Sequence, residues 1–216
     1  MNPLKSRRIA CQWVGAFVLG SALIFSVAAN AAEATADAFI KTVSSDILDK
    51  IKADKSILSG DITKISVLVD QRVMPNVNFP RMTASAIGPA WRQATPEQQK
   101  RLQEEFKLLL VRTYAGALSQ VSDQTIEVKP IRGEIDEKNL IIRTEVKGRG
   151  DPIQLDYRLE KTPGEGAGWM IYDLNVLGIW LIENYKSQFT KEINNGGLDG
   201  LILSLSERNK SNNKKP

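Results

Sequence analysis

Apolar residues in the first part of the chain recur every three to four positions, which is the spacing of helices with one buried face. The pattern predicts helices over residues 39–59, 61–73 and 80–87. Asp61 is placed to cap the second helix, which should stop before Pro75. Gly88-Pro89 should end the third helix, because a proline disrupts helical hydrogen bonding.

The clearest local signal is the segment Thr95-Pro96-Glu97-Gln98, which has the residue types of a capping box with a proline in the first turn. It predicts a long helix that runs to about Val121. Apolar side chains from Leu102 to Val121 form one wide stripe on this helix. A stripe of that width should face a substantial apolar partner.

Beyond this helix the apolar spacing changes to every second residue, which predicts strands. Four such runs cover residues 126–129, 140–147, 153–160 and 169–176. Glycine-containing turns separate them, so they should form an antiparallel meander with one apolar and one solvated face. The fourth run is less clearly sided, because apolar residues occur at both its odd and its even positions.

Helical spacing returns after Gly178 and predicts one helix that ends at residues 194–197 and a short last helix over 199–205. Residues 206–216 are polar and charged, so we expect a disordered tail. Helices before and after a meander make an α+β fold. We expect a four-stranded, twisted antiparallel sheet that is packed on one face by several helices.

The first residues are organised differently. Basic residues at positions 5–8 precede an apolar run over 9–28, and Ala29-Asn30-Ala31 offers a small-x-small cleavage site. This layout is typical of a secretory signal peptide that is cleaved after residue 31, here for export to the periplasm. An uncleaved membrane anchor is the alternative, since the run approaches the length that spans a bilayer. The chain then divides into a signal peptide (1–31), a single α+β domain (32–205) and the tail (206–216).

The amino-acid composition excludes several classes of catalytic and metal-binding site. The chain has no histidine, and its one cysteine, Cys11, would leave with the signal peptide. The mature protein would then lack a Ser-His-Asp triad, a histidine or thiolate metal site and a disulfide. The formal charge of +4 includes basic residues of the signal peptide and of the tail, so we expect no nucleic-acid partner. An enzyme would have to use Asp, Glu, Tyr, Lys, Ser or Thr, and we expect no metal and no cofactor.

Three blocks of residues carry a family resemblance. The first is 91–98 (WRQATPEQ), 106–110 and 112–114 (RTY); the second is 156–159 (DYRL) and 169–176 (WMIYDLNV); the third is 178–180, 184–185 and 189. In this order they resemble the MlaC-type family of periplasmic phospholipid-binding proteins, which is also called the toluene-tolerance auxiliary family. The resemblance spans nearly the whole mature chain.

The resemblance implies a periplasmic carrier that holds phospholipid acyl chains in an apolar cavity between the sheet and the helices. It implies two protein partners, an inner-membrane ABC transporter with an MCE-domain component and an outer-membrane lipoprotein–porin complex. Lipid that shuttles between them would maintain the lipid asymmetry of the outer membrane. The phospholipid is then cargo rather than a cofactor, no catalytic motif is carried over, and we expect a monomer.

Apolar residues on the predicted stripes are candidate walls of this cavity, and ordinary core packing is the competing interpretation for each. The candidates lie at the end of the second helix, on the long helix and on the strands: Val73, Met74, Val77, Phe79, Leu109, Leu110, Tyr114, Ile142, Thr144, Val146, Leu155, Tyr157, Tyr172 and Leu174. The flexible side chain of Met74 can adapt to different acyl chains. Thr144 reduces the bulk on an otherwise apolar face.

Two other classes of function stay open. An enzyme on a related α+β cone would use Asp156 or Asp173 as a base with a tyrosine, and it would need that carboxylate inside the cavity with a raised pKa. A protein adaptor would bind a partner through its apolar surface and would hold no lipid. Asp173 could instead accept backbone amides or pair with Arg92. Arg81 and Arg92 could contact a phosphate or form exposed ion pairs.

Overall fold

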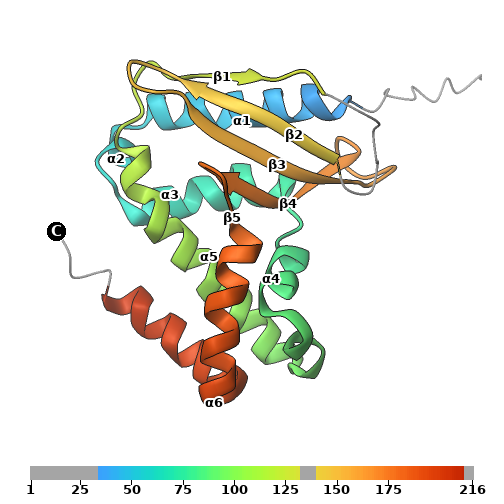
Figure 1. Cartoon of the computed structure of the whole chain (residues 1–216). Helices are drawn as coiled ribbons and strands as arrows, with labels where there is room; N and C mark the ends of the chain where they lie inside the picture. Colours follow the sequence, from blue (N-terminus) through green and yellow to red (C-terminus); the bar gives the residue numbers. More distant parts are fainter. Residues whose placement is uncertain (1–33, 132–139, 212–216) are drawn as a thin grey trace, which may run out of the picture. The chain divides into compact units, whose positions relative to one another are not determined.

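Helices form the first and last parts of the described chain, and a sheet lies between them in sequence (Figure 1). The computed structural model describes residues 34–131 and 140–211, so the signal-peptide prediction lies outside the described residues. In chain order the elements are α1 (Ala36–Ala53), α2 (Lys55–Leu58), α3 (Ile62–Leu68), the π-helix η1 (Val69–Val73), the 3-10 helices η2 (Met74–Asn76) and η3 (Gly88–Gln93) on either side of α4 (Phe79–Ile87), α5 (Pro96–Leu118), β1 (Thr125–Val128), β2 (Leu140–Lys147), β3 (Ile153–Lys161), β4 (Trp169–Val176), β5 (Ile179–Trp180) and α6 (Leu181–Ser211). Within the described ranges, no helix has both the length and the apolar character needed to cross a membrane.

Capping residues fix where two of the helices begin. The Asp61 carboxylate accepts hydrogen bonds from the backbone amides of Thr63 and Lys64 at 2.9 and 3.1 Å, at the start of α3. At the start of α5, Thr95 and Gln98 each accept the other's backbone amide through their side chains. The predicted capping box is therefore confirmed, and it satisfies amides that a helix leaves unpaired at its first turn.

The sheet is an antiparallel meander in the order β1-β2-β3-β4-β5. The predicted meander is confirmed, but the sheet has five strands rather than four, because the short strand β5 was not predicted. Leu177 and Gly178, with φ of 51° and 88°, form a two-residue turn that pairs Ile179 with Val176. The sequence predicted a helix here because the apolar residues around Trp180 also fit helical spacing.

One face of the sheet is buried. Along β2, Ile142 and Thr144 are buried, whereas Ile141 and Arg143 are exposed. We call the buried side the inner face and the opposite side the outer face. Helix α1 packs along β1 and β2 (Figure 1), and its Ser44 contacts the inner-face residue Tyr157.

A β-bulge explains the unclear sidedness of the fourth predicted strand. Arg158 pairs with Asp173, but the next residue of β3 pairs with Ile171, so Tyr172 is one extra residue in β4. An extra residue reverses the alternation of side chains beyond it. Ile171 consequently shares the inner face with Leu174, although the two are an odd number of residues apart.

The apolar interior is divided into two clusters. The main cluster lies between the inner face, the first half of α1, and helices α4, α5 and α6. In it the ring of Phe106 lies 5.7 Å from that of Phe79, 4.9 Å from Tyr185 and 5.2 Å from Phe189, within the range of favourable aromatic contacts. The second cluster joins the end of α1, α2, α3 and the second half of α5: Ile51, Ile57, Ile65, Leu68, Val111 and Ala115.

Helix α6 continues past the end that its polar sequence predicts. It kinks at Gly197 (φ 65°, ψ −164°), which confirms the predicted break, and then runs to Ser211. Ser206 and Asn209 are buried, and Asn209 Nδ2 donates to the Glu105 carboxylate of α5 at 2.6 Å. The prediction of a disordered tail from residue 206 is therefore wrong for residues 206–211.

Candidate functional site

Helices α1 and α5 contribute to both apolar clusters, and several apolar side chains that pack against one or the other cluster are only half-buried. They come from α1, from η1 and η2, from α5 and from the inner face of β3 and β4: Val43, Ile47, Val69, Val73, Met74, Leu110, Tyr114, Leu155 and Leu174. We call this set the seam. Interiors are normally close-packed, so inward apolar side chains that stay partly accessible indicate a place where an apolar molecule can be added.

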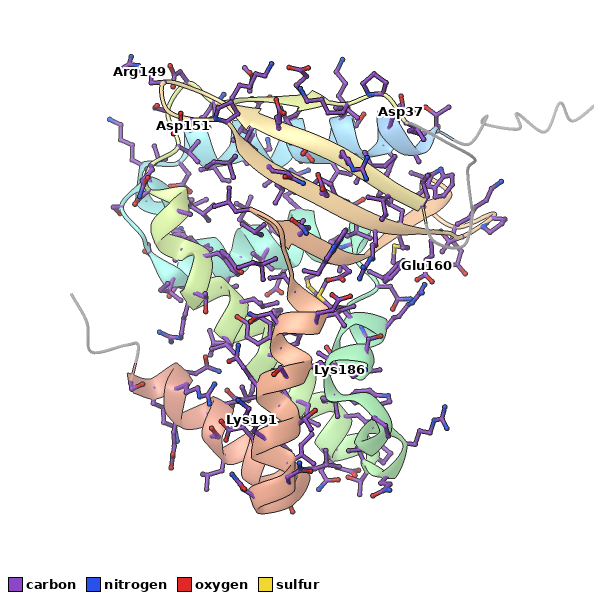
Figure 2. The ribbon with its side chains drawn as sticks, in the orientation of Figure 1. Asp37, Arg149, Asp151, Glu160, Lys186 and Lys191 are labelled. Atoms are coloured by element: carbon purple, nitrogen blue, oxygen red, sulfur yellow. The ribbon has the colours of Figure 1, made fainter. Side chains whose placement is uncertain are left out.

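The inner face opens toward one end of the sheet. Along β3, the exposed fraction of the inward side chains rises from 0% at Leu159 and 7% at Tyr157 to 44% at Ile153, and Leu155 between them is half-buried. Strands β2 and β4 also have half-buried inward residues at this end. The turn between β2 and β3, which carries Arg149 in Figure 2, marks the end where the seam meets solvent. We call it the open end.

Three hydroxyl groups lie where the buried and half-buried parts of the inner face meet. The Tyr157 hydroxyl is 3.1 Å from Ser44 Oγ on α1. Thr144 Oγ1 donates to the backbone oxygen of Leu155. Burial raises the pKa of Tyr157 to about 12, so this hydroxyl remains neutral near pH 7. The Ser44–Tyr157 contact joins α1 to the sheet at this depth.

The structure brings most of the predicted wall residues together. Those in or against the main cluster are Val73, Met74, Val77, Phe79, Leu109, Leu110, Tyr114, Ile142, Leu155, Tyr157 and Leu174. Thr144 is buried on the inner face, and Val146 is half-buried at its open end. Sequence reasoning missed Val43, Ile47 and Val69, whose helical spacing was visible but whose partial exposure was not. The contact of these residues with a lipid stays a prediction.

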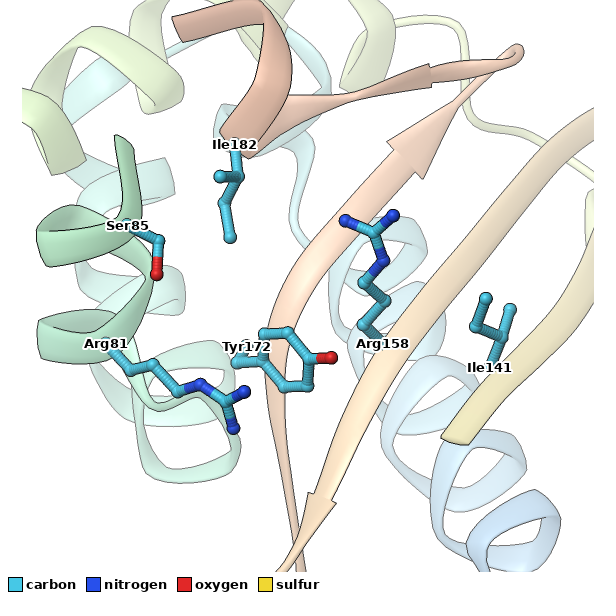
Figure 3. A pocket seen from close by; sticks show the side chains of 6 residues that line it. All are labelled: Arg81, Ser85, Ile141, Arg158, Tyr172 and Ile182. Carbon is cyan, nitrogen blue, oxygen red and sulfur yellow. The ribbon is translucent and has the colours of Figure 1, made fainter. Parts of the chain in front are cut away.

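Tyr172 does not share the inner face with the other predicted wall residues. As the extra residue of the bulge, it lines an open groove of about 440 Å³ in which the outer-face residues Ile141 and Arg158 also take part. Figure 3 shows how the groove is lined by side chains from the sheet, α4 and α6: Arg81, Ser85, Ile141, Arg158, Tyr172 and Ile182. The placement of Tyr172 with the inner wall is therefore wrong, because the bulge turns it to the other side.

The groove is bordered by ion pairs. The Arg81 guanidinium lies 3.6 Å from the centroid of the Tyr172 ring and pairs with Glu160 of β3, which also accepts a hydrogen bond from Asn78 Nδ2 at the start of α4. Arg158 Nη1 donates to both Asp173 and Glu183 at 2.8 Å. Both arginines thus have carboxylate partners, and a lining of paired charges does not suit the burial of acyl chains.

Asp173 holds a structural position. Its carboxylate accepts the backbone amides of Leu174 at 2.9 Å and Ile182 at 3.1 Å, as well as Arg158, rather than pairing with Arg92. Burial, opposed by these hydrogen bonds, raises its pKa to about 6. A raised pKa is what the enzyme alternative requires, but this carboxylate has three donors and is the register partner of the outer-face residue Arg158.

Asp156, the other candidate base, also belongs to the outer face. Its register partners are Arg143 on β2 and Asn175 on β4, and its carboxylate accepts Gln154 Nε2 at 2.6 Å. Although the side chain is only 4% exposed, it does not lie among the seam residues. Neither candidate carboxylate therefore faces the apolar side of the sheet, which is where the enzyme alternative would need it.

Comparisons with known proteins agree on one family. The family model described as MlaC protein matches residues 41–207. The intermembrane phospholipid transport system binding protein MlaC of Haemophilus influenzae is 25% identical over 194 residues, which are 88% of this chain and 89% of that protein. The toluene tolerance protein ttg2D of Pseudomonas putida is 27% identical over 162 residues, 74% of each. A solved structure of a phospholipid-binding protein from Ralstonia solanacearum, in complex with a phospholipid, matches with a TM-score of 0.79 and 46% identity and covers 84% of this chain and all of that one.

Proposed function

Because this chain belongs to the MlaC protein family, we propose that it is a periplasmic phospholipid carrier that holds acyl chains in the seam. The observation that carries the proposal is the phospholipid bound to the similar R. solanacearum protein. The seam supplies a matching surface in this chain, since its half-buried apolar residues come from helices on one side and from the inner face of the sheet on the other. An acyl chain between them would complete the packing.

The energetics of phospholipids explain why a carrier needs such a surface. Burying one methylene is worth ~0.8 kcal/mol, so exposing two full acyl chains to water costs on the order of 20 kcal/mol. Spontaneous escape from a bilayer is therefore slow. A carrier that buries the chains about as well as the bilayer does can take up and release lipid with little net change in free energy. The head group can stay in water at the open end.

We further propose the setting in which the carrier acts. Export would follow cleavage after residue 31, and the mature protein would act as a monomer. It would exchange lipid with an inner-membrane ABC transporter that has an MCE-domain component and with an outer-membrane lipoprotein–porin complex. This exchange would maintain the lipid asymmetry of the outer membrane. The H. influenzae relative's name, which assigns it to an intermembrane phospholipid transport system, supports this setting.

Native mass spectrometry of the protein purified from the periplasm tests the function. The expected result is an intact mass that begins at residue 32 with stoichiometric bound phospholipid, identified after lipid extraction. Protein that contains no lipid and does not take up phospholipid from vesicles, while still binding a protein partner, would instead support the adaptor alternative. A mass that retains residues 1–31 would show that the chain stays anchored.

A further inference from the structure

Tyr157 lies at the boundary between the open and the filled parts of the inner face. Along β3 it lies between Leu159, which is 0% exposed and belongs to the main cluster, and Leu155, which is a half-buried residue of the seam. Its register partners on the neighbouring strands are Ile142, which is 0% exposed, and Leu174, which is half-buried. An acyl chain that enters along β3 from the open end would therefore meet the Tyr157 ring as the first buried side chain on the inner face of this strand.

A buried hydrogen bond holds this ring in place. Ser44 Oγ on α1 lies 3.1 Å from the Tyr157 hydroxyl. The ring itself is 7% exposed. A ring that moved aside would leave its hydroxyl and that of Ser44 unpaired in an apolar interior, which is unfavourable. The Tyr157 ring thus blocks an entering acyl chain, whereas an aliphatic side chain without a hydrogen bond at this position would move aside more easily.

We propose that Tyr157 is the stop that limits how far an acyl chain enters the seam, and that it thereby sets the chain length that the protein prefers. The proposal rests on the carrier function proposed above. Tyr157 determines specificity by touching the end of the acyl chain. Ser44 is a positioning residue that acts through it.

Two opposing contributions give the stop its effect. Each further methylene that is buried favours binding by about fourfold. Displacing the ring, however, breaks the buried Ser44–Tyr157 hydrogen bond and leaves both hydroxyls unpaired, and this loss outweighs the gain from one or two methylenes. Acyl chains that end before the ring bind without this loss. Longer ones must leave methylenes exposed at the open end that a bilayer would bury, so that extra length lowers their occupancy.

The proposal is tested by a competition between phosphatidylcholines. The lipids differ only in acyl-chain length, and each is two carbons longer than the one before. Delipidated mature protein is mixed with vesicles of the whole series, and native mass spectrometry measures which lipids it holds. Tyr157→Val removes the ring and keeps a good strand former. It should shift occupancy toward longer acyl chains by about fourfold for each additional methylene buried. Tyr157→Phe and Ser44→Ala keep the ring but remove its hydrogen bond to α1. They should therefore shift occupancy toward longer acyl chains by a smaller factor.

Tyr172→Val is the matched control, because Tyr172 belongs to the same sheet but faces the outer groove. It should leave the preferred chain length unchanged. If Tyr157→Val does not fold, Tyr157→Phe provides the test. Lipid-bound Tyr157 variants that keep the wild-type preference would overturn the stop but not the carrier function. Wild-type protein that takes up none of the lipids would overturn the carrier function, so the two failures are distinguishable.

Discussion

At the scale of single residues, Asp173 makes the stability of the protein depend on pH. Its pKa is about 6 in the folded protein, above the usual 3.8, because burial disfavours the charged form. The folded state therefore binds this proton more tightly than the unfolded chain does. The contribution of Asp173 to the free energy of unfolding should be greatest below about pH 4, fall by up to ~3 kcal/mol as the pH rises to about 6, and then stay level.

Urea unfolding of the wild type and of Asp173→Asn across this pH range measures the contribution. The asparagine oxygen can still accept the amides of Leu174 and Ile182, and Arg158 retains Glu183 as a partner. The difference in unfolding free energy between the two proteins should therefore change between pH 4 and pH 6 and be constant above it. A difference that does not vary with pH would show that Asp173 is not the titrating group.

At the scale of elements, the β4–β5 turn has a residue that is unusual for its conformation. Leu177 has φ 51°, a left-handed conformation that favours glycine and asparagine, and its side chain is 64% exposed. Leu177→Asn should therefore stabilise the protein by about 1 kcal/mol, since it relieves backbone strain and loses no buried surface. The midpoint of urea unfolding measures this change.

Leu203 provides the matched control for this substitution. It is a similarly exposed leucine, at 59%, but it lies within the helix α6. Leu203→Asn should destabilise the protein by a few tenths of a kcal/mol, because asparagine is a poorer helix former than leucine. If Leu177→Asn also destabilised the protein, the exposed leucine would have to make contacts that outweigh its strained backbone.

Elements that depend on local chemistry could be predicted from the sequence, and those that depend on pairing could not. The start of α5 was predictable because Thr95 and Gln98 satisfy each other's backbone amides within one turn. The bulge at Tyr172 was not, because the extra residue is defined only by the register of β4 against β3. Strand β5 was missed for a similar reason, since two paired residues leave no periodicity to detect.

The last turns of α6 show a second limit of sequence reasoning. Residues 206–211 are polar and gave no apolar pattern. Asn209 is nevertheless 3% exposed, because it donates to the carboxylate and the backbone oxygen of Glu105 on α5. A polar side chain that is buried by one specific hydrogen-bond partner cannot be distinguished from a solvated one until that partner is placed.

At the scale of the whole described molecule, the proposed function rests on the half-buried residues that pack against the two apolar clusters. The sequence identified most side chains of the apolar interior, such as Leu110 and Tyr114, from their spacing on α5. The sequence could not distinguish residues that pack only against other side chains from residues that could contact a bound lipid, because both kinds are apolar and both face inward. Only partial exposure distinguishes the seam from residues such as Phe106, which is 0% exposed.

The most direct test of this account compares two tryptophan substitutions on opposite faces of the sheet. Leu155 is a half-buried residue of the seam, and Ile141 is a 37% exposed residue of the outer face. Lipid occupancy of Leu155→Trp and Ile141→Trp is measured by native mass spectrometry, and their stability by urea unfolding. Leu155→Trp is expected to lose roughly tenfold in occupancy, because the indole fills space that an acyl chain needs, while Ile141→Trp keeps its lipid. Full occupancy in Leu155→Trp, or loss in Ile141→Trp alone, would contradict this expectation.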